Sequence, residues 1–154
     1  MEFKGIFPFT WSWWNWDVYS ILKKPYPREK SSFELSDEEL SREYYFDKEP
    51  LWTLICEEAV DTEHSYIYYQ CVYREILKRG ISAEELKIAR KFMWLTAGWL
   101  NFKCLKWDWV ELTEEDIKEA IALQYQYKFI GQKKRERMLA YVKYIGDLDH
   151  SGKP

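Results

Sequence analysis

The chain has 154 residues, which suits one domain with its own hydrophobic core. Its formal net charge of −3 gives no overall attraction to nucleic acid or to anionic lipid. Three cysteines without a CxxC motif indicate reduced core thiols and disfavour a disulfide framework or a zinc site. Aromatic residues make up 19% of the sequence, and Trp and Tyr serve both as core fillers and as anchors of binding surfaces.

Uncharged stretches of the chain are short. The longest, residues 5–16 and 92–102, fall below the roughly 18–20 apolar residues that a membrane-spanning helix requires. The amino terminus carries Glu2 and has no cleavage-site pattern, so a signal peptide is not expected. These features predict a cytoplasmic protein without a membrane partner.

Within residues 1–16, MEFKGIFPFTWSWWNW, the aromatic residues at positions 7, 9, 11 and 13 alternate with smaller residues at the period of a strand. Pro8 disfavours a central strand, so we expect residues 1–13 to form an extended aromatic arm, followed by a short helix over residues 14–23. The arm either packs across the helical domain as a strap or docks a protein partner, and both alternatives stay open. The candidate partner-binding residues are Phe7, Phe9, Trp11, Trp13, Trp14 and Trp16.

Two further helices are expected before residue 80. Ser36 and Glu39 form a capping-box pattern that opens a short acidic helix, and residues 34–49 together predict a solvated acidic face. Pro50 and Gly80 suit the start and the cap of one long helix over residues 50–79. Its expected apolar face comprises Leu51, Ile55, Ala59, Tyr66, Tyr69, Tyr73, Ile76 and Leu77.

The helix predicted over residues 50–79 carries a possible metal site. Glu57, Asp61 and His64 are spaced i, i+4, i+7 and would share one helix face, where they and Glu58 could hold a divalent metal. The Asp-x-x-His spacing resembles the Glu-x-x-His motif of ferritin-like di-iron bundles. The Glu-Glu-x-x-Asp spacing resembles part of the EExxE motif of all-helical MazG-type nucleotide pyrophosphohydrolases. These resemblances imply a metal-dependent hydrolase or a di-metal oxidase, although the second acidic motif of the pyrophosphohydrolases is missing from the next helix.

Glu58 also falls within the apolar stripe of this predicted helix. A carboxylate there needs a partner, and the sequence offers Arg90 or tyrosine hydroxyl groups. We expect a buried structural pair in preference to a catalytic acid.

The central element is a helix over residues 82–107. Ser82 and Glu85 form a capping box at its start. Its apolar residues cover more than half of the helical wheel, which predicts burial on most sides. Gly98 lowers helix stability relative to Ala, and we expect a close helix crossing to require it.

Two helices are expected after this central element. Thr113 caps the first, with three acidic residues in its first turn, and its expected core face comprises Ile117, Ala120, Ile121, Leu123, Tyr127 and Ile130. The second covers about residues 132–145, with Met138, Leu139, Tyr141, Val142 and Ile145 facing inward. Residues 147–154 are predicted to form a flexible tail.

The last predicted helix carries a basic patch that consists of Lys133, Lys134, Arg135 and Arg137. Such a patch can bind nucleic acid or an acidic protein partner, or it can be a solvated face or pair with acidic groups of the same chain. All of these alternatives stay open at the level of the sequence.

Taken together, the sequence predicts an all-α protein with a single domain over residues 1–146. Five or six helices surround the buried central helix, and no cofactor is expected. The leading functional hypothesis is a non-enzymatic interaction module that binds a protein partner or a second copy of itself. The alternatives are a metal-dependent enzyme on the helix over residues 50–79 and nucleic-acid binding through the helix over residues 132–145.

Overall fold

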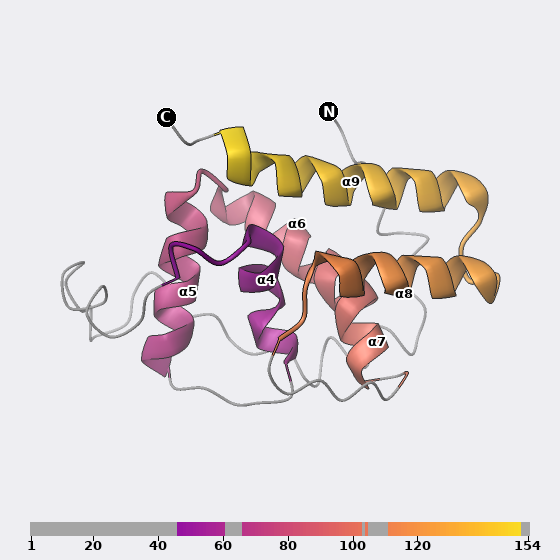
Figure 1. Cartoon of the computed structure of the whole chain (residues 1–154), viewed down its shortest axis with the longest axis horizontal. Coiled ribbons are helices and arrows are strands. Elements are labelled where there is room, and N and C mark those ends of the chain that lie inside the picture. Colours follow the sequence, from indigo (N-terminus) through magenta and orange to yellow (C-terminus); the bar gives the residue numbers. More distant parts are fainter. Residues whose placement is uncertain (1–45, 61–65, 103, 105–110, 152–154) are drawn as a thin grey trace.

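The computed structural model of the chain describes residues 46–60, 66–102, 104 and 111–151 (Figure 1). Within these ranges the chain forms helices and turns and no strand, so the predicted all-α class is confirmed. The aromatic arm and the two helices predicted before residue 46 lie outside the described residues. The predictions made for them stay predictions.

The first described segment differs from the one long helix predicted over residues 50–79. Helix α4 (Leu51–Cys56) continues into a single 3-10 turn, η1 (Glu57–Ala59), and helix α5 (Tyr66–Lys78) follows separately. Val60 has φ −74° and ψ 141°, an extended conformation that ends the helical path. The carbonyl of Ala59 accepts a hydrogen bond of 2.9 Å from Asn101 Nδ2, so a distant side chain uses the acceptor that a continuing helix would need.

The central element runs through helix α6 (Ala83–Met93), a π-helical segment η2 (Trp94–Gly98) and helix α7 (Trp99–Phe102). The predicted capping box is present, because Glu85 N donates to Ser82 Oγ at 3.1 Å and Ser82 N donates to the Glu85 carboxylate at 3.3 Å. All residues from Phe92 to Asn101 are buried. Burial on all sides is therefore confirmed for this half of the element, whereas Ile88 on α6 is 42% exposed.

Gly98 makes room for a tryptophan ring of the same element. A Cβ atom at this position would lie 2.6 Å from Cε3 of Trp94, in the π-helical segment. The indole ring of Trp94 thus occupies the space that a side chain at residue 98 would fill. The predicted helix crossing beside Gly98 stays a prediction.

Helices α8 (Glu114–Gln126) and α9 (Gln132–Ser151) run antiparallel and side by side as a hairpin (Figure 1). Thr113 precedes α8 as predicted. Its backbone N and its hydroxyl donate hydrogen bonds to the Asp116 carboxylate, at 2.7 Å and 3.2 Å. Leu139, predicted to face inward, is 37% exposed, because the inward stripe of α9 follows Met138, Tyr141, Val142 and Ile145.

Helix α9 extends beyond Gly146 to Ser151, so the prediction of a flexible tail is wrong for residues 147–151. The Asp149 carboxylate accepts a hydrogen bond from Leu51 N at 2.6 Å and pairs with Arg79 at 2.8 Å. Arg79 also donates to the carbonyl oxygens of Phe46, at 2.8 Å, and Glu49, at 2.5 Å. These long-range contacts fasten the last turn of α9 to the start of α4 and the end of α5.

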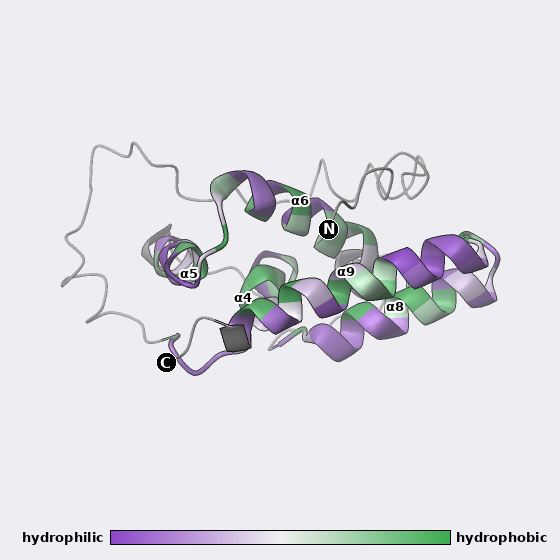
Figure 2. Cartoon of the chain, turned by 90° about the horizontal axis from the view of Figure 1, so that it is seen from above, coloured by the Kyte–Doolittle hydropathy of each residue, from purple (hydrophilic) through white to green (hydrophobic). Residues whose placement is uncertain are grey.

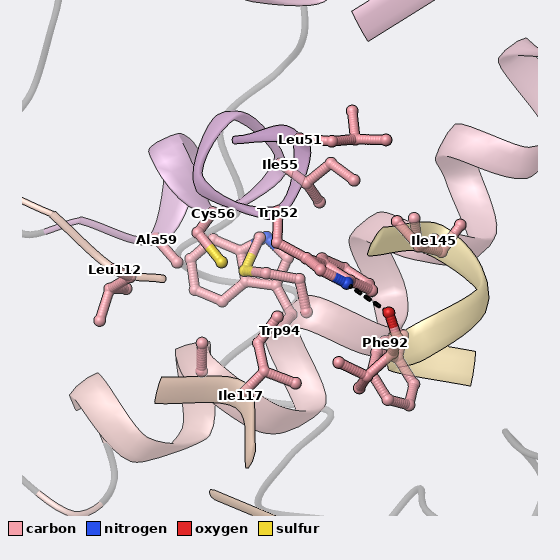
Figure 3. Close-up of a cluster of buried hydrophobic side chains, with 14 of the residues drawn as sticks. Leu51, Trp52, Ile55, Cys56, Ala59, Phe92, Trp94, Leu112, Ile117 and Ile145 are labelled. Carbon is pink, nitrogen blue, oxygen red and sulfur yellow. Dashed lines mark hydrogen bonds between the residues drawn. The ribbon is translucent and has the colours of Figure 1, made fainter. Parts of the chain in front are cut away.

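The core gathers side chains from α4, the central element, α8 and α9 (Figure 3). Trp52, Phe92 and Trp94 are its largest fully buried side chains. Trp52 Nε1 donates a hydrogen bond of 2.9 Å to the carbonyl of Val142, which ties α4 to α9 while satisfying the buried indole N–H (Figure 3).

Candidate functional site

Glu58 is the anchor of a buried polar junction between η1 and the central element. Its side chain is inaccessible to solvent, and its two carboxylate oxygens accept hydrogen bonds from Arg90 Nε at 3.0 Å and Nη2 at 2.8 Å. Trp94 Nε1 donates a third hydrogen bond, at 2.6 Å. The predicted pairing of Glu58 with Arg90 is therefore confirmed, and the junction neutralises the buried charge.

Glu57, the preceding residue, has different surroundings. It is only 9% exposed and accepts a hydrogen bond of 2.9 Å from the hydroxyl of Tyr68 on α5. Burial is the main cause that raises the pKa of the Glu57 carboxyl; the hydrogen bond from Tyr68 lowers it, and the charges of Glu49 and Glu111 raise it. Together these effects place the pKa at about 7. Glu57 can therefore gain or lose a proton near neutral pH.

Only part of the predicted metal site lies within the described residues, so the site stays a prediction. Glu57 and Glu58 lie in η1, which is followed by the extended Val60. Asp61 and His64 themselves lie outside the described residues. Among the residues that the structure describes, no group of three or more His, Cys, Asp or Glu side chains is arranged to hold a metal ion.

The second candidate surface is the turn between α8 and α9. The α8 helix ends in a Schellman motif, in which Phe129 N donates to the carbonyl of Gln124 at 2.8 Å and Lys128 N donates to that of Tyr125 at 3.1 Å. Lys128 has φ 63°, in the left-handed region where this motif normally places glycine. The turn has a defined conformation even though a lysine occupies its strained position.

This turn exposes two aromatic rings. Tyr127 is 62% exposed and Phe129 is 54% exposed, whereas the next residue, Ile130, is buried. The Phe129 ring meets Trp99 edge to face, with centroids 6.4 Å apart. The prediction that Tyr127 faces the core is wrong, because α8 ends at Gln126 and the helical period no longer applies to the residues that follow.

The predicted basic patch lies beside these rings, in the first turns of α9. Lys133 and Arg137 are exposed, and Lys134 is half-buried. Arg135 stacks over the Tyr125 ring, with its guanidinium carbon 4.1 Å from the ring centroid. Burial, together with the charge of Arg137, lowers the pKa of Lys134 to about 8.

The structure thus brings together one predicted group of residues and two aromatic residues that the sequence pattern had not assigned to a surface. Figure 2 shows hydrophilic residues concentrated along α9 toward this end of the hairpin. The end of α8 could have indicated that Tyr127 and Phe129 are exposed, because residues beyond a helix end no longer follow the helical periodicity. We define the tip surface as Tyr127, Lys128, Phe129, Lys133, Lys134 and Arg137.

The remaining predicted site is the set of aromatic partner-binding candidates, Phe7, Phe9, Trp11, Trp13, Trp14 and Trp16. These residues lie outside the described residues. No described helix combines the length and the apolar character needed to cross a lipid bilayer.

No protein-family model matches the sequence, and no curated protein or solved structure matches it either.

Proposed function

We propose that this protein is a non-enzymatic protein–protein interaction module, an accessory subunit or an inhibitor-like binder, that contacts its partner through the tip surface. The observation that carries this proposal is the pair of exposed rings, Tyr127 and Phe129, beside the cations at the start of α9. Aromatic side chains of this type supply most of the affinity at protein interfaces, whereas neighbouring charges steer and orient the encounter.

The rigidity of the turn supports this proposal. The carbonyl of Gln124 accepts hydrogen bonds from both Phe129 N and Ile130 N, and the buried Ile130 side chain anchors the turn in the core. On the α9 side, the Tyr125 hydroxyl donates to Gln132 Oε1 at 3.1 Å. A surface that is already ordered loses less conformational entropy on binding, so more of the contact energy appears as affinity.

The test is affinity capture from the source cells with the full-length chain and a Tyr127→Ser/Phe129→Ser variant. Ile88→Ser is the matched control, because Ile88 is a comparably exposed apolar residue on α6. We expect a partner that is enriched on the wild-type chain and on the control and is depleted on the double variant by at least about tenfold. Circular dichroism of all three proteins verifies that they retain the same helicity.

Equal recovery of every captured protein on the double variant and on the wild-type chain would overturn the proposed contact surface. The aromatic residues of the predicted arm are a second proposed contact, and removal of the first ten residues tests it separately. Retained helicity with loss of capture supports a docking arm, whereas aggregation of the shortened chain supports a packing strap.

A further inference from the structure

We infer that a groove along the α8–α9 hairpin binds a second copy of this chain, with the two hairpins antiparallel to each other. The groove lies along the two helices and is separate from the tip surface, so self-association at the groove and partner binding at the tip can succeed or fail independently. Two observations support self-association here: the groove is open to solvent, and the order of its charges is complementary to itself.

The groove lies between α8 and α9 and has a volume of about 390 Å³. We call it the shaft groove and define it by its lining residues, Glu114, Lys118, Leu139, Lys143, Gly146 and Asp147. A Cβ atom at residue 146 would lie 3.1 Å from Glu114 Oε1, so the Glu114 side chain packs directly beside Gly146. Four of the lining residues are exposed, namely Lys118, Leu139, Lys143 and Asp147. A second molecule can therefore reach the groove.

The charged residues of the shaft groove form two bands across the hairpin. Glu114 and Asp147 make the acidic band, because Glu114 packs beside the residue that precedes Asp147. Lys118 and Lys143 make the basic band. Because the helices are antiparallel, each lysine lies four residues closer to the tip than the carboxylate on its own helix (Figure 1). The two bands are therefore about 6 Å apart along the helix axes.

This order of charges is self-complementary about a two-fold axis that crosses both helices midway between the bands. A second hairpin related by that axis is antiparallel to the first, so each acidic band faces a basic band. Lys143 then faces Asp147 of the second copy, Lys118 faces Glu114 of the second copy, and the symmetry produces each pair twice. A two-fold axis parallel to the helices would instead place lysine against lysine, which like-charge repulsion disfavours.

The ion pairs within one copy are compatible with this contact. Lys143 pairs with Asp147 at 2.7 Å and Lys118 pairs with Glu115 at 3.3 Å, and all four side chains are at least 46% exposed. Exposed pairs of this type contribute little to stability, so these lysines can turn toward a further carboxylate at little cost. Between two copies, water is partly excluded from the groove, and the attraction between opposite charges is stronger there than at a free surface.

The dimensions of the face predict a weak dimer. Helix α8 has 13 residues, which corresponds to a length of about 20 Å, and two packed helices with their side chains are about 20 Å wide. Two such faces bury about 800 Å² in total, less than the roughly 1,200–2,000 Å² of stable complexes. We therefore expect a reversible monomer–dimer equilibrium, which salt weakens because ion pairs hold the copies together.

Sedimentation equilibrium of the full-length chain at low ionic strength, from about 10 μM to about 1 mM, measures this equilibrium. Lys143→Glu should weaken the dimer at least about tenfold, because the two-fold symmetry counts its repulsion with Asp147 twice. The matched control is Lys87→Glu, which reverses an exposed lysine that also has an ion pair within its own helix, on α6. We expect this control to retain the wild-type dissociation constant.

Exchanging the two charges of α9 tests the antiparallel register. The Lys143→Asp/Asp147→Lys variant again has opposite charges facing each other across its own two-fold axis, so it should dimerise like the wild type. Mixed dimers of this variant with the wild-type chain should be depleted, because lysine then faces lysine and aspartate faces aspartate. Native mass spectrometry of a mixture in which one protein is isotope-labelled distinguishes mixed from pure dimers. Statistical mixing of the two proteins would overturn the inference.

Three other results would also overturn it. A chain that stays monomeric at all concentrations and a dimer that Lys143→Glu and Lys87→Glu weaken equally are the first two, and both leave the proposed function intact. The third is a dimer that is lost in the Tyr127→Ser/Phe129→Ser variant, because self-association would then occur at the tip surface. Circular dichroism of every variant verifies that its helicity is unchanged.

Discussion

At the scale of single residues, Lys128 combines a backbone cost with a position on the surface. Its φ of 63° is readily adopted by glycine, whereas a residue with a Cβ atom is strained there. We expect Lys128→Gly to raise the free energy of unfolding by up to about 1 kcal/mol. Denaturant unfolding checks this effect, and a less stable variant would contradict it.

Glu57 predicts a pH dependence of stability with a definite sign. Its pKa rises from 4.5 to about 7 on folding, so the folded state holds the proton more tightly than the unfolded chain does. The contribution of Glu57 to stability is therefore fully present below pH 4.5 and is lost as the pH rises through about 7. The contribution of Glu57 to the free energy of unfolding is at most about 3 kcal/mol.

Glu57→Gln tests this dependence, because glutamine retains an acceptor for the Tyr68 hydroxyl but does not titrate. We expect the difference in unfolding free energy between wild type and variant to change between pH 5 and pH 8, with the wild type losing more. Denaturant titrations at the two pH values measure it. Parallel pH profiles of the two proteins would show that Glu57 is not protonated in the folded state.

At the scale of elements, the π-helical segment depends on the packing of Trp94 against Gly98. We expect Gly98→Ala to lower the unfolding free energy by about 1–3 kcal/mol, because its Cβ would lie 2.6 Å from the indole ring. Helix propensity alone predicts the opposite, a gain of roughly 1 kcal/mol.

The matched control for this substitution is Gly131→Ala, whose Cβ would meet no atom within 4 Å. Gly131→Ala should therefore have little effect on unfolding. Thermal melts followed by tryptophan fluorescence report on both variants, since Trp94 lies at the tested contact. A Gly98→Ala protein as stable as the wild type would show that the indole shifts without loss of packing.

Two aspartates near the end of α9, Asp147 and Asp149, should contribute differently to stability. Asp149→Ala removes an acceptor for Leu51 N and the partner of Arg79, both part-buried, and we expect a loss of about 1–3 kcal/mol. Asp147→Ala, two residues earlier, removes only an exposed pair with Lys143 and should cost less than about 1 kcal/mol. Denaturant unfolding of both variants checks this. Equal effects would indicate that the last turn of α9 contributes nothing specific to stability.

At the scale of the whole molecule, the aromatic residues divide between two roles. The three tryptophans of the described residues, Trp52, Trp94 and Trp99, are all buried, whereas Tyr127 and Phe129 are exposed. The high aromatic content therefore supports the core and the proposed surface at the same time. Charge is divided as well, with cations at the tip of the hairpin and acidic residues at its opposite end.

Features that depend on neighbouring residues could be predicted from the sequence alone. The capping residues Ser82 and Thr113 were predictable because their hydrogen bonds span three positions of the chain. The buried half of the central element was predictable because apolar residues cover more than half of its circumference. The sequence also indicated that Glu58 needs a partner, because its carboxylate interrupts an apolar stripe.

Where helices stop and which side chains remain exposed depend instead on contacts between distant parts of the chain. The helix predicted over residues 50–79 ends near Val60, where Asn101, 42 residues away from Ala59, uses the carbonyl of Ala59. Helix α9 continues past Gly146 because Asp149 bonds to Leu51, 98 residues earlier. Tyr127 is exposed because the end of α8 redirects it. Local periodicity contains no information about such distant partners, and their hydrogen bonds and packing outweigh the small energies of helix propensity.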